Sequence, residues 1–188
     1  MRILKNALSL SHDMLEKVVE KNDIVVDATC GKGNDTIFLA NLVGAGGRVY
    51  SFDVQDKAIE IAKRSVNENG LSDIVQFVCD GHENLDFYVK DNTLSAVIFN
   101  LGYLPTGDHS ISTKPYTTII GVQKSLKLIK KNGLVVVVVY SGGDTGFLEK
   151  NSVLDFVKKL DAKKYNVMQV DFVNQINNPP ILVCIEKL

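Results

Sequence analysis

The sequence predicts an α/β fold in which a mainly parallel sheet is covered by helices on both faces. Short apolar runs alternate with amphipathic stretches along most of the chain, as in parallel strands joined by right-handed helical crossovers. Near the C-terminus two strand-like runs follow each other without a helix between them, which favours an antiparallel final pair. The length of 188 residues and the hydrophobic share of 45% suit a single domain over residues 1–188.

Each element is placed by its pattern. Residues 56–69 put Ala58, Ala62 and Val66 on one helix face, and the five consecutive valines before Tyr140 indicate a strand buried on both faces. The expected strands are 24–26, 48–52, 74–78, 94–99, 134–140, 165–173 and 181–186. The expected helices are one amphipathic helix within the first twenty residues, then 34–43, 56–69, 116–129 and one that Ser152 caps and that runs to about 160. Loops are expected at 102–115 and 141–146.

Composition and charge exclude several classes of protein. The net charge of −1 is not typical of a nonspecific nucleic-acid binder, which is usually basic overall. No apolar run approaches the roughly 20 residues of a membrane span, and His12, Asp13 and Glu16 interrupt any signal-peptide core. Three scattered cysteines without a Cys/His cluster fit reduced thiols and predict no metal site. We therefore expect a cytoplasmic protein that does not bind membranes.

Polar residues end five of the predicted strands, at Asp27, Asp53, Asp80, Asn100 and Tyr140-Ser141. Ligands of an open parallel sheet bind beyond the carboxyl ends of the strands, so these positions predict one site. Tyr140 and the glycine-rich segment after it could bound a substrate pocket.

The first three strand ends together predict a pocket for an adenosine. Asp27-Ala-Thr-Cys-Gly-Lys-Gly-Asn-Asp35 is a glycine loop between a strand and a helix, Asp53 is placed to bind ribose hydroxyls, and Asp80 could reach an adenine amine. Structural turns and a helix N-cap are the alternatives. Without a phosphate-binding motif, the pocket favours S-adenosylmethionine (SAM) over NAD or ATP. The predicted cofactor-binding residues are Asp27, Thr29, Gly31, Gly33, Asn34, Asp35, Asp53, Val54, Asp80, Gly81, His82 and Asn100.

The fourth strand end predicts the acceptor side. Asn100-Leu-Gly-Tyr-Leu-Pro105 resembles the Asn-Pro-Pro-Tyr type motif of amine methyltransferases, with Leu-Gly in place of Pro-Pro. An Asn carbonyl and a neighbouring backbone carbonyl can hold the N–H groups of an amine and aim its lone pair, which is catalysis by alignment. The predicted catalytic residues are Asn100, Leu101, Tyr103 and His109. His12 on the first helix fits a surface or packing role better.

The chain resembles a family of small bacterial class I methyltransferases long labelled rRNA methylases, some of which are assigned to tRNA modification. The resemblance covers nearly the whole chain. It rests on the glycine loop through Thr36, on the segment from Asn100 to Pro105 with Thr117-Thr118, and on Gln175-x-Asn-x-Pro-Pro180. It implies a seven-stranded class I methyltransferase sheet, SAM as methyl donor and assembly as a homodimer. It also implies that the substrate is the amine of 5-aminomethyl-(2-thio)uridine at the wobble position of a tRNA anticodon.

Three alternatives remain at this point: methylation of ribosomal RNA, methylation of a small-molecule amine, and a module that binds an adenosyl ligand without catalysis. His109 and Asp27 are both candidates for taking a proton from the amine. Lys124, Lys127 and Lys131 would share one helix face and could contact phosphates of the RNA, although a solvated helix face is the simpler interpretation.

Overall fold

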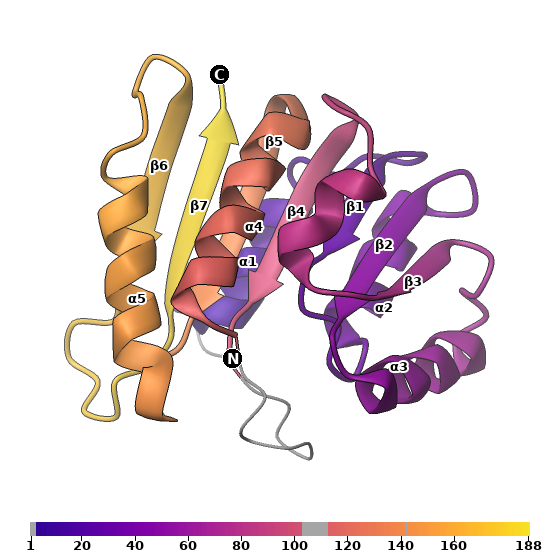
Figure 1. The fold of residues 1–188 in the computed structure, drawn as a ribbon, viewed down its shortest axis with the longest axis horizontal. Coiled ribbons are helices and arrows are strands. Elements are labelled where there is room, and N and C mark those ends of the chain that lie inside the picture. Colours follow the sequence, from indigo (N-terminus) through magenta and orange to yellow (C-terminus); the bar gives the residue numbers. More distant parts are fainter. Residues whose placement is uncertain (1–2, 103–112, 142) are drawn as a thin grey trace.

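The computed structural model describes residues 3–102, 113–141 and 143–188, with the side chains of 143–145 left aside. Its elements in chain order are α1 (Ala7–Leu15), β1 (Ile24–Asp27), α2 (Asn34–Val43), β2 (Arg48–Asp53), α3 (Asp56–Glu68), β3 (Val75–Cys79), the 3-10 helix η1 (His82–Phe87), β4 (Leu94–Asn100), α4 (Pro115–Leu128), β5 (Ile129–Val139), α5 (Gly143–Val157), β6 (Tyr165–Val170) and β7 (Ile181–Lys187). Figure 1 shows their arrangement.

The seven strands form one sheet in the order β3-β2-β1-β4-β5-β7-β6. The first five strands pair in parallel, and β7 is antiparallel to both β5 and β6. The predicted mainly parallel sheet with an antiparallel final strand is confirmed. None of the helices in the described part of the chain has the length and apolar character that crossing a membrane requires.

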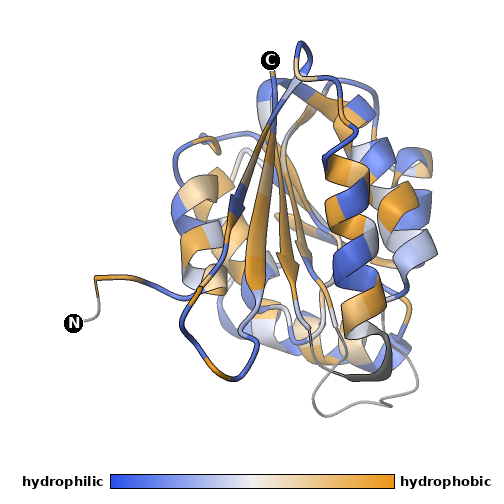
Figure 2. Ribbon diagram, turned by 90° about the vertical axis from the view of Figure 1, so that its left-hand side faces the viewer, coloured by the Kyte–Doolittle hydropathy of each residue, from blue (hydrophilic) through white to orange (hydrophobic). Residues whose placement is uncertain are grey.

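Helices cover both faces of the sheet, as Figure 2 shows with the sheet seen close to edge-on. One apolar cluster lies between the sheet and η1, α4 and α5, and it takes in Val135, Val137 and Val139. A second cluster lies under α1 and α2 and takes in Val136 and Val138. The valine run of β5 therefore faces both layers, which is why its residues are uniformly apolar.

Several predicted boundaries are wrong. The helix α5 begins at Gly143, so the expected loop at 141–146 is mostly helical, and Ser152 lies inside the helix, where its Oγ donates to the Leu148 carbonyl at 2.8 Å. Strand β6 ends at Val170, before the expected Val173. The 3-10 helix after β3 was not expected. The first helix is shorter than its amphipathic pattern and begins after Asn6, whose side chain accepts from the Ser9 N–H at 2.8 Å.

Asn132 and Gly133, which separate the expected helix 116–129 from the expected strand 134–140, lie inside β5. Leu94 of β4 pairs with Ile129 and Ala96 with Leu134, so the residues between these two partners bulge out of the ladder. Asn132 has a left-handed φ of 63°, a conformation that asparagine tolerates. A helix, a bulge and the long buried strand therefore follow one another directly.

Candidate active site

The carboxyl ends of the five parallel strands meet at one edge of the sheet. Asp53 of β2 pairs with Cys79, the residue before Asp80, and Asp27 of β1 pairs with Ile98, two residues before Asn100. Asn100 in turn pairs with Val138 of β5. The polar residues that the sequence analysis singled out therefore line this edge in the order expected for one elongated site.

Asp27 lies beneath the glycine loop and holds it in shape. Its side chain is fully buried, one oxygen accepts from the Thr29 N–H at 3.1 Å, and the other accepts from the Thr36 hydroxyl at 2.6 Å. Burial, and then the charge of Asp35, raises the pKa of Asp27 to about 7. The side chain of Asp27 has no exposed surface and faces its own loop and α2, whereas the sequence led us to expect it to face a ligand.

This raised pKa predicts how stability depends on pH. Asp27 takes up its proton near pH 7 in the folded chain and near pH 4 in the unfolded chain. Between these values the folded state binds more protons, so its stability falls as the pH rises. We expect Asp27→Asn to remove most of this loss, worth roughly 2–4 kcal/mol, in urea unfolding of the cofactor-free chain at pH 4.5 to 7.5. Equal pH slopes for Asp27→Asn and wild type would contradict this, and Asp73→Asn, an exposed site, is the control.

The glycine loop leads into α2 and is tied to the next strand. Gly33, the N-cap of α2, has a φ of 83°, and a Cβ placed there would lie 3.0 Å from the Cβ of Ala62 on α3. The Gly31 N–H donates to Asp53 Oδ2 at 2.9 Å. Because Gly33 has no side chain to cap the helix, the first N–H groups of α2 are left for a ligand carboxylate.

Asp53 and Asp80 stand next to each other at the outer part of the site. The Gln55 N–H donates to Asp53 Oδ1 at 2.9 Å, and Gln55 rather than Asp53 is the N-cap of α3. Asp80 accepts from the Asn84 side chain at 2.9 Å, and this bond is the main reason that the pKa of Asp80 is lowered. Both residues can offer side-chain oxygens to a nucleoside.

Three further predicted cofactor residues lie on either side of this pair. Val54 is 58% exposed beside Asp53 and can offer an apolar contact. Gly81 donates its N–H to Asp80 Oδ1 at 2.7 Å. The ring of His82 is buried against Phe99, and its Nδ1 lies 3.2 Å from the Ala28 carbonyl. The side chain of His82 therefore faces the core, and only its backbone could reach a ligand.

Asn100 has a fixed amide orientation. Its backbone N–H donates to Thr29 Oγ1 at 2.8 Å, and its side-chain Nδ2 donates to Asp35 Oδ2 at 3.1 Å. With the amide nitrogen bound to Asp35, the carbonyl Oδ1 is the group left to accept an N–H. This is the arrangement that alignment of an amine requires.

The neighbours of Asn100 divide into three groups. The Leu101 side chain is buried in the core, and its N–H donates to the Val138 carbonyl at 3.0 Å, so a role toward substrate falls to its backbone carbonyl. Tyr103 and His109 lie outside the described residues. Tyr140 is 38% exposed at the end of β5, and burial, followed by the charge of Asp35, raises its pKa.

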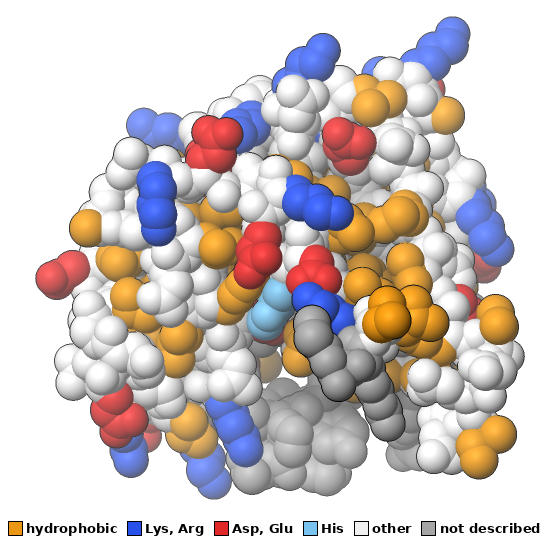
Figure 3. All heavy atoms as spheres, turned by 180° about the vertical axis from the view of Figure 1, so that it is seen from behind, with side chains coloured by type: hydrophobic (Ala, Val, Ile, Leu, Met, Phe, Trp, Pro, Cys, Tyr) orange, Lys and Arg blue, Asp and Glu red, His pale blue; other side chains and the backbone are white. Residues whose placement is uncertain are grey.

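His12 is a residue that sequence reasoning missed. From α1 its Nε2 reaches Asp35 Oδ1 at 2.7 Å, and its ring stacks on Phe38 of α2 with centroids 3.8 Å apart. Asp35 thus lies between His12 and Asn100, with one oxygen toward each. Figure 3 shows a histidine side chain beside acidic ones on the face that lies behind the view of Figure 1.

Glu149 of α5 binds two threonines at the beginning of α4, Thr113 just before the helix and Thr118 in its first turns. Its buried carboxylate accepts from the Thr113 hydroxyl at 2.8 Å and from the Thr118 hydroxyl at 2.6 Å. Thr113 in turn accepts from the Gly102 N–H at 3.0 Å through its Oγ1, and its own N–H donates to the Gly102 carbonyl at 3.0 Å. Burial raises the pKa of Glu149.

We expect Glu149→Ala to lower the free energy of unfolding by about 2 kcal/mol, because it leaves the buried Thr118 hydroxyl and the half-buried Thr113 hydroxyl without their acceptor. Glu149→Gln keeps one oxygen and should cost about half as much. Asp155→Ala, at an exposed site on the same helix, is the matched control and should change stability by less than about 0.5 kcal/mol. Chemical unfolding measures all three. Similar values for Glu149→Ala and Asp155→Ala would show that these hydrogen bonds contribute nothing.

The predicted stripe of three lysines does not form. Lys124 is paired with Asp86 at 2.7 Å, and α4 ends at Leu128, so Lys131 belongs to β5.

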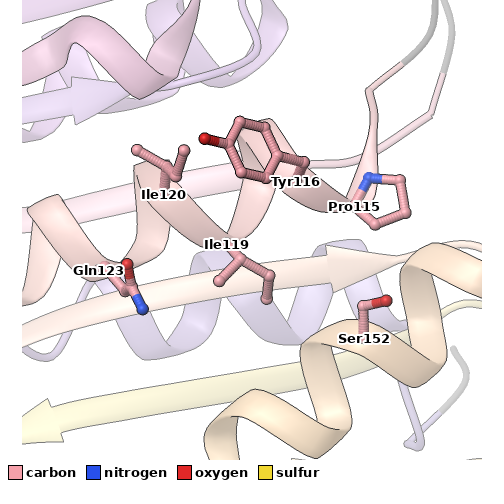
Figure 4. A pocket seen from close by; sticks show the side chains of 6 residues that line it. All are labelled: Pro115, Tyr116, Ile119, Ile120, Gln123 and Ser152. Atoms are coloured by element: carbon pink, nitrogen blue, oxygen red, sulfur yellow. The ribbon is translucent and has the colours of Figure 1, made fainter.

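A shallow groove of about 400 Å³ lies between α4 and α5, as Figure 4 shows. Its lining contains none of the predicted site residues: Pro115, Tyr116, Ile119, Ile120, Gln123 and Ser152.

Comparisons with known proteins show the family to which this chain belongs. The model of the family described as "Putative rRNA methylase" matches residues 49–186. A model for protein-L-isoaspartate(D-aspartate) O-methyltransferase matches residues 6–88. A curated chloroplastic tRNA (mnm(5)s(2)U34)-methyltransferase from Arabidopsis thaliana is 33% identical over 97% of this chain and 70% of its own length.

Two solved structures share both fold and sequence with this chain. A protein from Clostridium thermocellum described as "putative rRNA-methylase" is 53% identical, with a TM-score of 0.97 and full coverage of both chains. A methyltransferase from Streptococcus mutans, solved in complex with SAH, is 41% identical, with a TM-score of 0.90, and the match covers 99% of this chain and 100% of the other.

Proposed function

This chain belongs to the rRNA methylase family and is a SAM-dependent methyltransferase, and from this premise we propose its substrate. It methylates the primary amine of 5-aminomethyluridine, or of the 2-thio form, at the wobble position of a tRNA anticodon. The product is the 5-methylaminomethyl nucleoside. The partner is the anticodon stem-loop of that tRNA, and the enzyme works in the cytoplasm.

The orientation of the Asn100 amide carries the choice of an amine as acceptor. Asp35 holds the amide nitrogen at 3.1 Å, so Oδ1 of Asn100 accepts an N–H of the substrate, and the backbone carbonyl of Leu101 accepts a second. With two N–H groups held by these contacts, the lone pair of the amine nitrogen is free to point toward the methyl group of SAM. Alignment of this kind supplies much of the rate enhancement in a direct transfer.

The residues along the other strand ends fit SAM. Asp53 binds the ribose hydroxyls, the Asp80 side of the site receives the adenine beside Val54, and the N-terminus of α2 with Thr29 and Asn34 receives the methionine carboxylate. SAM supplies an electrophilic methyl group on a sulfonium. We assign the parts of SAM to these positions from three features described above: two half-buried carboxylates, the uncapped N-terminus of α2 and the glycine loop.

We choose tRNA over rRNA as the substrate because of the plant relative, which is named for U34 of tRNA and is similar over 97% of this chain. The rRNA label of the family and its bacterial structures keeps ribosomal RNA as the second candidate. From the family resemblance of the sequence, we also propose that the enzyme is a homodimer.

The proposal is tested with four acceptors and purified enzyme: an anticodon stem-loop with 5-aminomethyluridine at the wobble position, the same stem-loop with unmodified uridine, the free 5-aminomethyluridine nucleoside, and ribosomal RNA. We expect methyl transfer to the first alone, with one methyl added to the side-chain nitrogen. Transfer to the free nucleoside at an equal rate would indicate a small-molecule enzyme. Transfer to ribosomal RNA alone would overturn the tRNA assignment.

A further inference from the structure

The proposed acceptor amine must lose a proton before it can react. A primary alkyl amine has a pKa of about 9 to 10, close to that of a lysine side chain. At neutral pH it is an ammonium without a lone pair, so one proton has to leave the nitrogen first. The identity of the group that receives this proton is a question separate from the orientation of the amine by Asn100.

Among the described acidic side chains along this edge, the contacts single out one. Asp27 has no exposed surface and lies beneath the glycine loop, where it accepts hydrogen bonds from Thr29 and Thr36. Asp53 and Asp80 lie at the ends of β2 and β3, on the side of β1 away from β4. Asp35 is left, and its Oδ2 lies 3.1 Å from the nitrogen of the same Asn100 amide whose oxygen faces the amine.

The surroundings of Asp35 suit a proton acceptor. Its side chain is 7% exposed, and the His12 side chain that contacts it is 27% exposed. The His12 Nε2 lies 2.7 Å from Oδ1 of Asp35, and Oδ2 lies on the side of Asn100. The other groups that face Asp35 are Asp27 from β1, Asn100 from β4 and Tyr140 from β5. Among the described residues, no lysine or arginine forms an ion pair with Asp35.

We propose that Asp35 is the catalytic residue that accepts the proton of the substrate ammonium and that His12 is its positioning residue. The N–H bond of the ammonium breaks, its electron pair stays on nitrogen as the lone pair, and the proton forms an O–H bond with Oδ2 of Asp35. After the product leaves, Asp35 returns the proton to water. This inference rests on the proposed amine substrate.

The test is the pH dependence of single-turnover methylation of the 5-aminomethyluridine stem-loop, from pH 6.5 to 9.5. We expect Asp35→Asn to reduce the rate about 100-fold or more at pH 7. The defect should shrink to a few-fold at pH 9.5, where much of the amine is already neutral. Asp13→Asn, an acidic residue on α1 paired with Lys5, is the matched control and should follow the wild type at every pH.

Two readouts separate this role from a structural one. The dissociation constant for SAM and the thermal midpoint are measured for each variant without RNA, and both should stay close to wild type. A defect that is constant with pH, together with weaker SAM binding, would assign Asp35 to the cofactor and overturn the proposal. A rate equal to wild type at pH 7 would overturn it as well.

His12 gives a second test should Asp35→Asn fail to fold. We expect His12→Gln, which can still donate a hydrogen bond to Asp35, to keep at least a third of the wild-type rate at pH 7. His12→Ala should lose at least tenfold at pH 7 and recover at pH 9.5. Equal rates for the two variants would contradict the positioning role. Failure of the proposed function is distinct, because the wild type would then methylate no aminomethyl substrate at any pH.

Discussion

Replacing Asn100 by alanine is expected to reduce the single-turnover methylation rate at least about 100-fold while SAM binding changes less than about threefold. The reason is that the side-chain Oδ1 aligns the acceptor amine, and loss of such alignment or of one directed hydrogen bond costs two orders of magnitude or more. The backbone N–H of residue 100 keeps its bond to Thr29 Oγ1 in the variant. The strand end should therefore hold its position.

The controls for this variant separate alignment from folding. Asn166→Ala, at an exposed position on β6, should leave rate and SAM affinity unchanged. Asn100→Asp preserves shape but places a second carboxylate next to Asp35, so we expect it to be inactive near neutral pH. An Asn100→Ala enzyme that methylates the aminomethyl stem-loop at more than a tenth of the wild-type rate would remove Asn100 from the acceptor site.

The second large effect is expected for Asp53→Asn, which should raise the dissociation constant for SAM about 10- to 100-fold. Asp53 accepts from the Gly31 N–H and the Gln55 N–H, and in the proposed site its remaining lone pairs accept from both ribose hydroxyls. The amide removes one acceptor and the charge, and hydrogen bonds to charged groups are worth about 1.5–3 kcal/mol. Isothermal titration of the RNA-free enzyme measures this.

At saturating SAM the Asp53→Asn rate should return to within a few-fold of wild type, because the acceptor side is intact. Asp73→Asn, an exposed carboxylate before β3, should bind SAM as the wild type does. Unchanged SAM affinity in Asp53→Asn would exclude Asp53 from the cofactor site, and a rate defect that saturation does not relieve would indicate that the glycine loop itself is displaced.

The sheet and the order of its polar strand ends could be predicted because both follow from local pattern and connectivity. Each strand is visible in the sequence as a short apolar run. Right-handed crossovers make these strands parallel, which places Asp27, Asp53 and Asn100 at the same edge of the sheet. His12 could not be found in this way. Its contact with Asp35 spans 23 residues and depends on how α1 packs against α2, which the amphipathic pattern of α1 does not specify.

Glu149 was missed for a different reason. Its surroundings are rich in glycine, so the sequence predicts a loop where α5 in fact begins. Gly146 is required there by packing rather than by a turn, because a Cβ would lie 3.0 Å from the Ser141 carbonyl carbon and 3.1 Å from the Tyr140 oxygen. The close approach of helix and strand end outweighs the poor helix propensity of glycine.

The central claim is that this chain methylates the aminomethyl group of a tRNA wobble uridine. It is tested most directly with bulk tRNA from a strain that lacks this gene, incubated with the purified protein and methyl-labelled SAM and then analysed by nucleoside mass spectrometry. We predict one labelled methyl on 5-aminomethyl-(2-thio)uridine and on no other nucleoside. An enzyme that binds SAM normally but leaves the tRNA unlabelled would contradict the claim.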